Sequence, residues 1–494
     1  MYSRIRLVAK TSFSGTGVAR LVSSRASTDT SPAAHRNGLK EILRKSGPRR
    51  SVSSLLQERV DSGHAVTLSE LRFISKRLIR SNRYDLAHQM MEWMETQKDV
   101  QLSAYDTALR LELIIKNHGL KDAEEYFEQL QSSGSLRVAK SAYLPLLRAY
   151  VKKKLVNEAE ALMEKLNGLG FLVTPHPFNE MMKLYETTHQ YEKVVTVISM
   201  MKGNKIPRNV LSYNLWMNAC GEISGVAGVE TVYREMIGDK SVEVGWSSLC
   251  TLANVYIKAG FDEKASLVLE SAEKKLNRSN RLGYFFLITL HASLGNKEGV
   301  VRLWEASKSV SGRITCANYI CVLSSLVRVG GVEEAERVFD EWEAKCCNYD
   351  VRVSNVLLGA YARDGEIRRA EALHERVLER GGDPNYKTWE ILMEGWVKCQ
   401  SMEKAIDAMQ RAFELMKGCH WRPSQNIVLA IAEHFEKEEK IEEANAYVRD
   451  LHRLGLASLP LYRLLLRMHE QSQRPAFHIY EMMKLDKIRM DDEC

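Results

Sequence analysis

Large apolar residues recur along this chain about every 35 residues, and each opens a stretch with the hydrophobic spacing of an α-helix. In the clearest period, apolar side chains from Tyr319 to Leu326 follow an i, i+3, i+4, i+7 pattern before a break at Gly330. A second stretch, apolar on one face and charged on the other, then begins at Val332. Each period therefore predicts two helices of about 12 to 14 residues joined by a short turn.

We call the residue that opens each period the anchor, and twelve anchors can be placed. They are Leu71, Tyr105, Tyr143, Phe178, Tyr213, Leu249, Tyr284, Tyr319, Ser354, Trp389, Val428 and Tyr462. Seven positions after many anchors stands an aromatic residue, and sixteen positions after many stands an alanine, as at Ala335. Three marks in phase over four hundred residues predict an all-α solenoid of about twelve 35-residue helix-turn-helix repeats, stacked on one continuous core.

Helical repeats of this length fall into a few families. Tetratricopeptide repeats carry a tryptophan and leucine-glycine signature that these periods lack, and HEAT and armadillo repeats run to about 40 to 47 residues. Residues 211–217 read LSYNLWM and residues 352–361 read RVSNVLLGAY. These segments resemble pentatricopeptide repeats, and the resemblance extends over residues 65–485. With its opening segment at 83–95, the chain is similar to the plant P-type subgroup of this family. The resemblance implies a right-handed α-solenoid.

The N-terminus has a different composition. Residues 1–28 hold five basic residues, six serines and no acidic residue, which is typical of an organelle transit peptide, and the arginines favour the mitochondrion over the chloroplast. The alternative is a basic tail that targets nothing. We expect residues 29–64 to form a basic linker, residues 65–485 the solenoid and residues 486–494 an acidic tail.

The charge of the chain is concentrated near its N-terminus. Of the net charge of +7, residues 1–28 contribute +5 and residues 29–60 a further +4, which leaves about −2 for the rest. A strong binder of nucleic acid usually carries an overall basic face. The balance therefore counts against indiscriminate RNA binding but leaves room for a local basic groove. No stretch reaches the eighteen apolar residues of a membrane span, so we expect no membrane association.

Catalytic motifs are weak in this sequence. One His-x-Glu occurs at His434 and Glu436, but the Pro-Cys-x-x-Cys that a zinc deaminase needs does not follow it. None of the nine cysteines forms a Cys-x-x-Cys pair, and we expect reduced thiols that pack as small apolar groups. Redox activity of the neighbours Cys346 and Cys347 is the alternative. We therefore expect no enzyme, no metal site and no cofactor.

The resemblance to pentatricopeptide repeats implies that two side chains per repeat read one RNA base. They are the residue after the anchor and the residue four before the next anchor. The pairs Asn179 with Asn209 and Asn355 with Asn385 resemble family pairs that favour pyrimidines. Three further polar residues at these positions are candidate RNA contacts: Asn214, Asn280 and Asp350.

Most other repeats depart from the family pattern. The second repeat pairs Asp106 with Ala139. In four repeats the residue after the anchor cannot hydrogen-bond to a base, namely Leu144, Phe285, Ile320 and Leu429. Two good pairs are too few to select one transcript. The asparagines also have a structural alternative, because asparagine near the first turn of a helix is a favoured cap that contributes about 1 kcal/mol.

Two functions remain open at this stage. The first is a non-catalytic, sequence-tolerant RNA-binding solenoid in mitochondrial RNA metabolism or translation, with single-stranded RNA, a transcript or ribosomal RNA, as its partner. The second is a structural or protein-binding solenoid, for example a mitochondrial ribosome component with ribosomal proteins as partners. The near-neutral solenoid favours the second, and the paired asparagines favour the first.

Overall fold

The structure is a computed structural model that describes residues 51–62, 66–97, 102–132, 136–277, 281–416 and 422–489. The expected transit peptide at residues 1–28 lies outside these ranges, as do the last five residues of the expected acidic tail. Within them, all regular secondary structure is helical. No helix of the described ranges is both long and apolar enough to cross a membrane.

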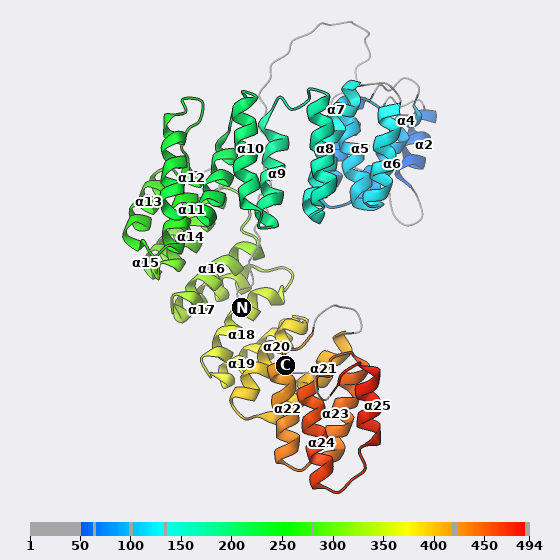
Figure 1. Cartoon of the computed structure of the whole chain (residues 1–494), viewed down its shortest axis with the longest axis vertical. Helices are drawn as coiled ribbons and strands as arrows, with labels where there is room; N and C mark the ends of the chain where they lie inside the picture. The colour runs from blue at the N-terminus through cyan, green and yellow to red at the C-terminus, as the bar shows by residue number, and fades with distance from the viewer. Residues whose placement is uncertain are drawn as a thin grey trace, which may run out of the picture. The chain divides into compact units, whose positions relative to one another are not determined.

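The helices, labelled as in Figure 1, have the following bounds. They are α2 (Val52–Asp61), α3 (Leu68–Arg80), α4 (Tyr84–Thr96), α5 (Ala104–Asn117), α6 (Leu120–Ser132), α7 (Leu136–Lys153), α8 (Val156–Gly168), α9 (Pro175–Thr187), α10 (Tyr191–Gly203), α11 (Val210–Gly238), α12 (Trp246–Lys258), α13 (Asp262–Lys274), α14 (Arg281–Ser293), α15 (Lys297–Lys308), α16 (Cys316–Arg328), α17 (Val332–Lys345), α18 (Val351–Arg363), α19 (Ile367–Glu379), α20 (Tyr386–Lys398), α21 (Met402–Met416), α22 (Gln425–Lys437), α23 (Ile441–Arg453), α24 (Leu459–Gln471) and α25 (Phe477–Leu485).

The chain divides into two compact units. The first ends at Leu172 and contains α2 to α8, and the second begins at Val173 and contains α9 to α25. Within each unit, helices pack on the next helix or the next but one along the chain, as α12 does on α13 and α5 on α7 (Figure 1). The sequence pattern gave no sign of this boundary, because the repeat period runs across it unchanged.

Helix pairing follows the predicted repeats. The long helix α11 contains a kink at Gly225, whose φ of 60° and ψ of −150° are not helical, and glycine adopts this conformation without steric cost. With α11 counted as the two helices on either side of the kink, α3 to α25 form twelve pairs. The predicted all-α architecture of about twelve helix-turn-helix repeats is therefore confirmed.

The marks that define the repeat occupy the core. Eleven anchors are buried, and so is every alanine sixteen positions later, including Ala335. Tyr105 is the exception, with 51% of its surface exposed. In that repeat Thr107 is the buried residue, Ser103 caps α5 four positions before it, and Ala123 follows it by sixteen positions. The anchor of the second repeat is thus Thr107, and the choice of Tyr105 was wrong because size was weighed above phase.

The range expected to be a basic linker contains a packed helix. In α2 the side chains of Val52, Leu55 and Leu56 are buried in the core of the first unit, together with Leu71 and Met90. The Val52 backbone N–H also donates to Gln89 Oε1 at 3.1 Å. Residues 52–61 therefore pack on the first repeat and are not a linker. Their apolar residues, spaced i, i+3 and i+4, predict a packed helix better than the basic composition of the range predicts a linker.

A polar contact recurs between neighbouring repeats. The Tyr361 hydroxyl donates to Glu336 of the preceding repeat at 2.6 Å, and Arg369 pairs with the same carboxylate. The equivalent positions hold two further sets: Tyr256, Glu230 and Lys264, and Trp396, Glu371 and Lys404. The aromatic residue seven positions after the anchor thus joins repeats through its polar end, in addition to filling the core.

Candidate nucleic-acid interface

The predicted reading positions lie at the junctions between repeats. In the first asparagine pair, the two side chains are hydrogen-bonded to each other. Asn179 lies in α9, and its Nδ2 donates to Asn209 Oδ1 at 3.1 Å. Asn209 is the N-cap of α11, and its Oδ1 also accepts from the Ser212 backbone N–H at 3.0 Å. The Ser212 hydroxyl closes the set by donating to Asn179 Oδ1 at 2.7 Å.

The second pair has the same arrangement five repeats later. Asn355 Nδ2 donates to Asn385 Oδ1 at 3.4 Å, and Asn385 is the N-cap of α20. The Thr388 backbone N–H donates to Asn385 Oδ1 at 3.1 Å, and the Thr388 hydroxyl donates to Asn355 Oδ1 at 2.9 Å. Each set contains an asparagine directly after the anchor, an asparagine that caps the next helix, and a hydroxyl residue directly before the next anchor. We call such a set a junction triad.

Junction triads turn their oxygens inward. Asn179 is 1% exposed and Asn355 is 8% exposed, whereas the caps Asn209 and Asn385 are half-buried. Because each cap oxygen must face the N–H groups of its helix, the amide nitrogen of the cap is the atom turned away. The capping alternative is therefore confirmed for Asn209 and Asn385. Contact with an RNA base remains a prediction for all four asparagines.

The three other candidates differ from one another. Asn214 is half-buried; its Nδ2 lies 3.5 Å from the Ser247 hydroxyl, and its Oδ1 is buried without a hydrogen-bond partner. Asp350 caps α18 by accepting from the Arg352 backbone N–H at 3.1 Å, and the guanidinium of Arg352 lowers the pKa of its carboxyl. Asn280 lies outside the described residues. A role of these three in RNA binding likewise stays a prediction.

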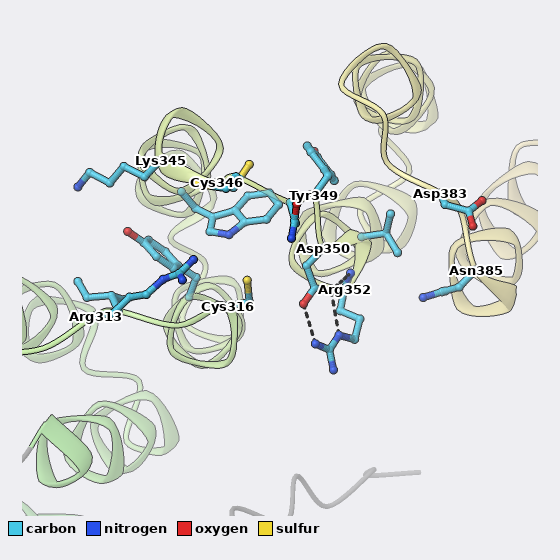
Figure 2. Close-up of a pocket in the computed structure, with 15 residues that line it drawn as sticks. Arg313, Cys316, Lys345, Cys346, Tyr349, Asp350, Arg352, Asp383 and Asn385 are labelled. Atoms are coloured by element: carbon cyan, nitrogen blue, oxygen red, sulfur yellow. Dashed lines mark hydrogen bonds and ion pairs between the residues drawn. The ribbon is translucent and has the colours of Figure 1, made fainter. Parts of the chain in front are cut away.

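Two of the candidates share an open cavity of about 800 Å³ in the second unit. Figure 2 shows Asp350 bonded to Arg352, and Asn385 on the wall formed by the next repeat. The lining contains three basic and two acidic side chains and three free cysteines: Arg313, Lys345, Arg352, Asp350, Asp383, Cys316, Cys346 and Cys347. Its charge is mixed, so the cavity by itself favours no single ligand. No group of histidine, cysteine or acidic side chains in the described ranges has the arrangement of a metal site.

In the first repeat an ion pair occupies the positions of a junction triad. Arg72 follows the anchor Leu71, and its Nε donates to Asp106 Oδ1 at 2.9 Å. Asp106 is completely buried and also accepts from the Ser103 backbone N–H. Burial alone would raise the pKa of Asp106, but the hydrogen bonds from Arg72 and Ser103 outweigh burial and lower it. The predicted pair of Asp106 with Ala139 was therefore out of register.

The near-zero net charge of the solenoid conceals a row of basic residues. Nine positions after the anchor, in the last turn of the first helix, eight of the twelve repeats carry an exposed lysine or arginine. The eight are Arg80, Lys116, Lys152, Lys258, Arg328, Arg363, Lys398 and Lys437. We call them the cation row. Acidic residues at other repeat positions cancel these charges in the net charge of the solenoid. A count of charge at each repeat position reveals the row.

The cation row is only partly neutralised by neighbouring side chains. Lys258 lies 2.6 Å from the Glu222 carboxylate, and Arg328 donates to the Ser293 hydroxyl at 3.1 Å. Arg363 donates to the carbonyl of Gly359 in its own helix. Equivalent positions of stacked helices lie on one face of each unit. The row therefore places a cation in all three repeats of the first unit and in five of the nine repeats of the second, four of them consecutive from Arg328 to Lys437.

Two family profiles agree with the repeat pattern. The profile of the PPR repeat matches residues 141–171, 318–347 and 353–382, and that of the pentatricopeptide repeat domain matches residues 161–223. Among solved structures, the pentatricopeptide repeat protein PPR10 from maize aligns with 93% of this chain and 70% of its own, at 17% identity and a TM-score of 0.44.

Relatives in Arabidopsis thaliana align over most of the chain. The pentatricopeptide repeat-containing protein At5g27460 is 81% identical over 491 residues, which are 99% of this chain and 100% of the relative. The protein At2g20710, whose name adds that it is mitochondrial, is 31% identical over 84% of each chain. At 81% identity over nearly the full length, the chain belongs to the pentatricopeptide repeat family.

Proposed function

We propose that this protein binds single-stranded RNA along its repeats, without chemistry of its own, and acts in mitochondrial RNA metabolism or translation. The observation that carries the proposal is the cation row, one exposed basic residue at the same position of eight repeats. Phosphates of single-stranded RNA recur at a regular spacing, and lysine and arginine contacts to them supply affinity that is independent of sequence. RNA is thus the ligand whose charge pattern matches the row.

Few bases are read in this proposal. The junction triads offer amide N–H groups at two repeats, and apolar residues occupy the reading positions of four others. Positioning by phosphate contacts and limited base contact give a sequence-tolerant binder. Transcripts and ribosomal RNA both satisfy these requirements.

The mitochondrial assignment rests on the N-terminus and on relatives. Residues 1–28 are rich in arginine and serine and lack acidic residues. Several relatives carry "mitochondrial" in their names, whereas that of the 81% identical relative does not. The opening segment at 83–95 supports membership of the P-type subgroup.

A second candidate is a protein-binding solenoid, for instance within the mitochondrial ribosome. The observation that favours it is the outer face of α25, where Phe477 is 82% exposed and Leu485 is 73% exposed. In a solenoid each repeat packs on its neighbours, and within the described residues these two large apolar side chains are left exposed. Protein binding at this face is compatible with RNA binding by the cation row.

Neutralising part of the row tests the proposal. A variant with Lys258, Arg328 and Arg363 changed to glutamine removes three of its charges while retaining long polar side chains. The slope of log affinity for a single-stranded RNA 20-mer against log salt should become shallower by about 2, since each phosphate contact contributes about 0.7.

The matched control changes Lys274, Arg337 and Arg453 to glutamine. These residues are also exposed cations, but they lie on the second helices of their repeats. The control should keep the wild-type slope. Equal slopes for all three proteins, or equal losses in both variants, would contradict a role of the cation row.

A further inference from the structure

The outer face of α25, the last helix of the described chain, lies where an inner helix meets the next repeat. In inner repeats, Glu336 of α17 and Glu371 of α19 directly follow the buried alanine of their helix. Each carboxylate accepts a hydrogen bond from the aromatic residue of the next repeat. In α25 the buried residue is Ile479, and Tyr480 follows it. Tyr480 therefore occupies the position that contacts a following repeat.

This face of α25 is apolar where inner repeats are charged. Phe477, Tyr480 and Leu485 each have more than half of their surface exposed. At about 100° per residue, the three lie within roughly 140° of the helix circumference, and the exposed Glu481 and Lys484 lie between them. We call these five residues the end face. Terminal repeats of solenoids ordinarily have a polar outer face, so an apolar one indicates that a partner covers it.

The two charges of the end face are complementary in sign. Glu481 and Lys484 form no ion pair with each other or with another residue of the described ranges. Two copies of α25 that pack antiparallel about a twofold axis can set Glu481 of each copy opposite Lys484 of the other. In that register Tyr480 of each copy falls opposite Leu485 of the other. The end face is thus complementary to itself in charge and in apolar surface.

The other end of the described chain does not match the end face. Helix α2 covers the first repeat, and its exposed side chains are mostly polar, namely Ser54, Gln57, Glu58 and Asp61. Head-to-tail stacking of copies would bury these polar groups against Phe477 and Leu485, which cannot hydrogen-bond to them, at a cost in free energy. A twofold pairing is therefore favoured over head-to-tail stacking.

We infer that the end face binds the end face of a second copy of this chain, so that the protein dimerises through α25. The inference goes beyond the proposed RNA binding and does not depend on it. Pairing of two such small faces buries less than the roughly 1,200 Å² of a standard interface, so we expect a reversible dimer with a Kd in the micromolar range. Each dimer would carry two cation rows and could hold two segments of RNA together.

Charge reversal within the end face tests the inference. Sedimentation equilibrium of the purified full-length protein, freed of RNA, should show a monomer–dimer equilibrium. Glu481→Lys and Lys484→Glu each set like charges opposite one another across the twofold axis and should raise the Kd about tenfold. Because the two variants are complementary to each other, their equimolar mixture should form heterodimers about as tightly as wild type forms dimers.

Glu375→Lys is the matched control, since it makes the same substitution at an exposed carboxylate of another second helix, α19, and should leave the Kd unchanged. Wild type that stays monomeric at every concentration would overturn the second copy as the occupant and leave the face to a different protein. Dimers that both single variants leave unchanged, equal weakening in the control, or a mixture no tighter than its components would overturn the end-face pairing. Because RNA is absent from these measurements, each such result leaves the proposed function standing.

Discussion

At the scale of single residues, an asparagine cap can serve a helix and a ligand with different atoms. The Oδ1 atoms of Asn209 and Asn385 accept from N–H groups of the helices that they cap. Their amide nitrogens are left for contacts outside the helix. Capping and base contact are therefore compatible at these two residues, whereas Asn179 and Asn355 are buried and act through the caps.

Loss of a cap should be measurable as stability. Asn385→Ala removes the acceptor for the Lys387 and Thr388 N–H groups and the partner of Asn355 Nδ2. We expect a cost of about 1–2 kcal/mol, seen as a lower midpoint of thermal unfolding. Asn385→Asp keeps an oxygen at the same place and should unfold near the wild-type temperature. Equal midpoints for wild type and Asn385→Ala would contradict the triad.

We expect Glu186 to make the stability of the fold depend on pH. Burial, opposed by a hydrogen bond from Asn218 and by Lys183, raises the pKa of the Glu186 carboxyl to about 7 from 4.5. Because the folded state holds the proton more tightly, the contribution of this group to stability is full below pH 4.5 and is lost as pH rises through 7. The free energy of unfolding should therefore fall between pH 5 and pH 8 by more in wild type than in Glu186→Gln. Parallel pH profiles of the two proteins in urea denaturation would show that Glu186 titrates normally.

The reading positions themselves followed from the repeat register, but their hydrogen bonds did not. Sequence identifies Asn179 and Asn209 as a pair thirty residues apart. It does not show that Ser212 joins them, because a serine before an anchor is equally compatible with a partner in its own helix. The same limit applies to Asn214 and Ser248, which occupy triad positions in sequence although the cap of α12 is Gly245, which has no side chain to join them.

At the scale of helices, periodicity was the most informative signal. Anchors spaced by 34 to 39 residues placed the twelve helix pairs, because the buried anchor position is large and apolar in most repeats. The anchor of the second repeat was placed at the wrong residue, because Tyr105 is large and aromatic whereas Thr107 is polar. In the structure Thr107 is buried and Tyr105 is exposed. Helix α2 was not predicted, because it precedes the first repeat and its apolar residues are not part of the 35-residue pattern.

Packing of the second helix on the first depends on the small residue sixteen positions after the anchor. Ala335 of α17 is completely buried in the core of the second unit. Ala335→Trp should overpack this contact and cost about 1–3 kcal/mol, and the loss should be concentrated in the neighbouring repeats. Hydrogen exchange measured by mass spectrometry would show faster exchange in α16 to α18.

Arg337→Trp serves as the control for that variant. It introduces the same side chain two residues away, where the arginine side chain is 73% exposed. Its exchange pattern should match wild type. Equal protection of α16 to α18 in all three proteins would contradict the helix contact at Ala335.

At the scale of the whole molecule, targeting is the first question. The composition of residues 1–28 predicts that this segment is removed on import into mitochondria. Terminal sequencing of the protein recovered from mitochondria should find a mature start between Ser23 and Arg36. Recovery of the intact chain from cytosol alone, beginning at Met1, would contradict targeting.

Binding of RNA in the organelle is the central claim, and sedimentation of the tagged full-length protein from mitochondrial lysate tests it most directly. Gradients run with and without ribonuclease, for wild type and for the variant with Lys258, Arg328 and Arg363 changed to glutamine, separate RNA-dependent from protein-dependent assembly. We predict that wild type sediments in a large complex that ribonuclease disperses, and that the variant sediments more slowly without ribonuclease. A large complex that resists ribonuclease and is unchanged in the variant would contradict RNA binding and favour the protein-binding solenoid.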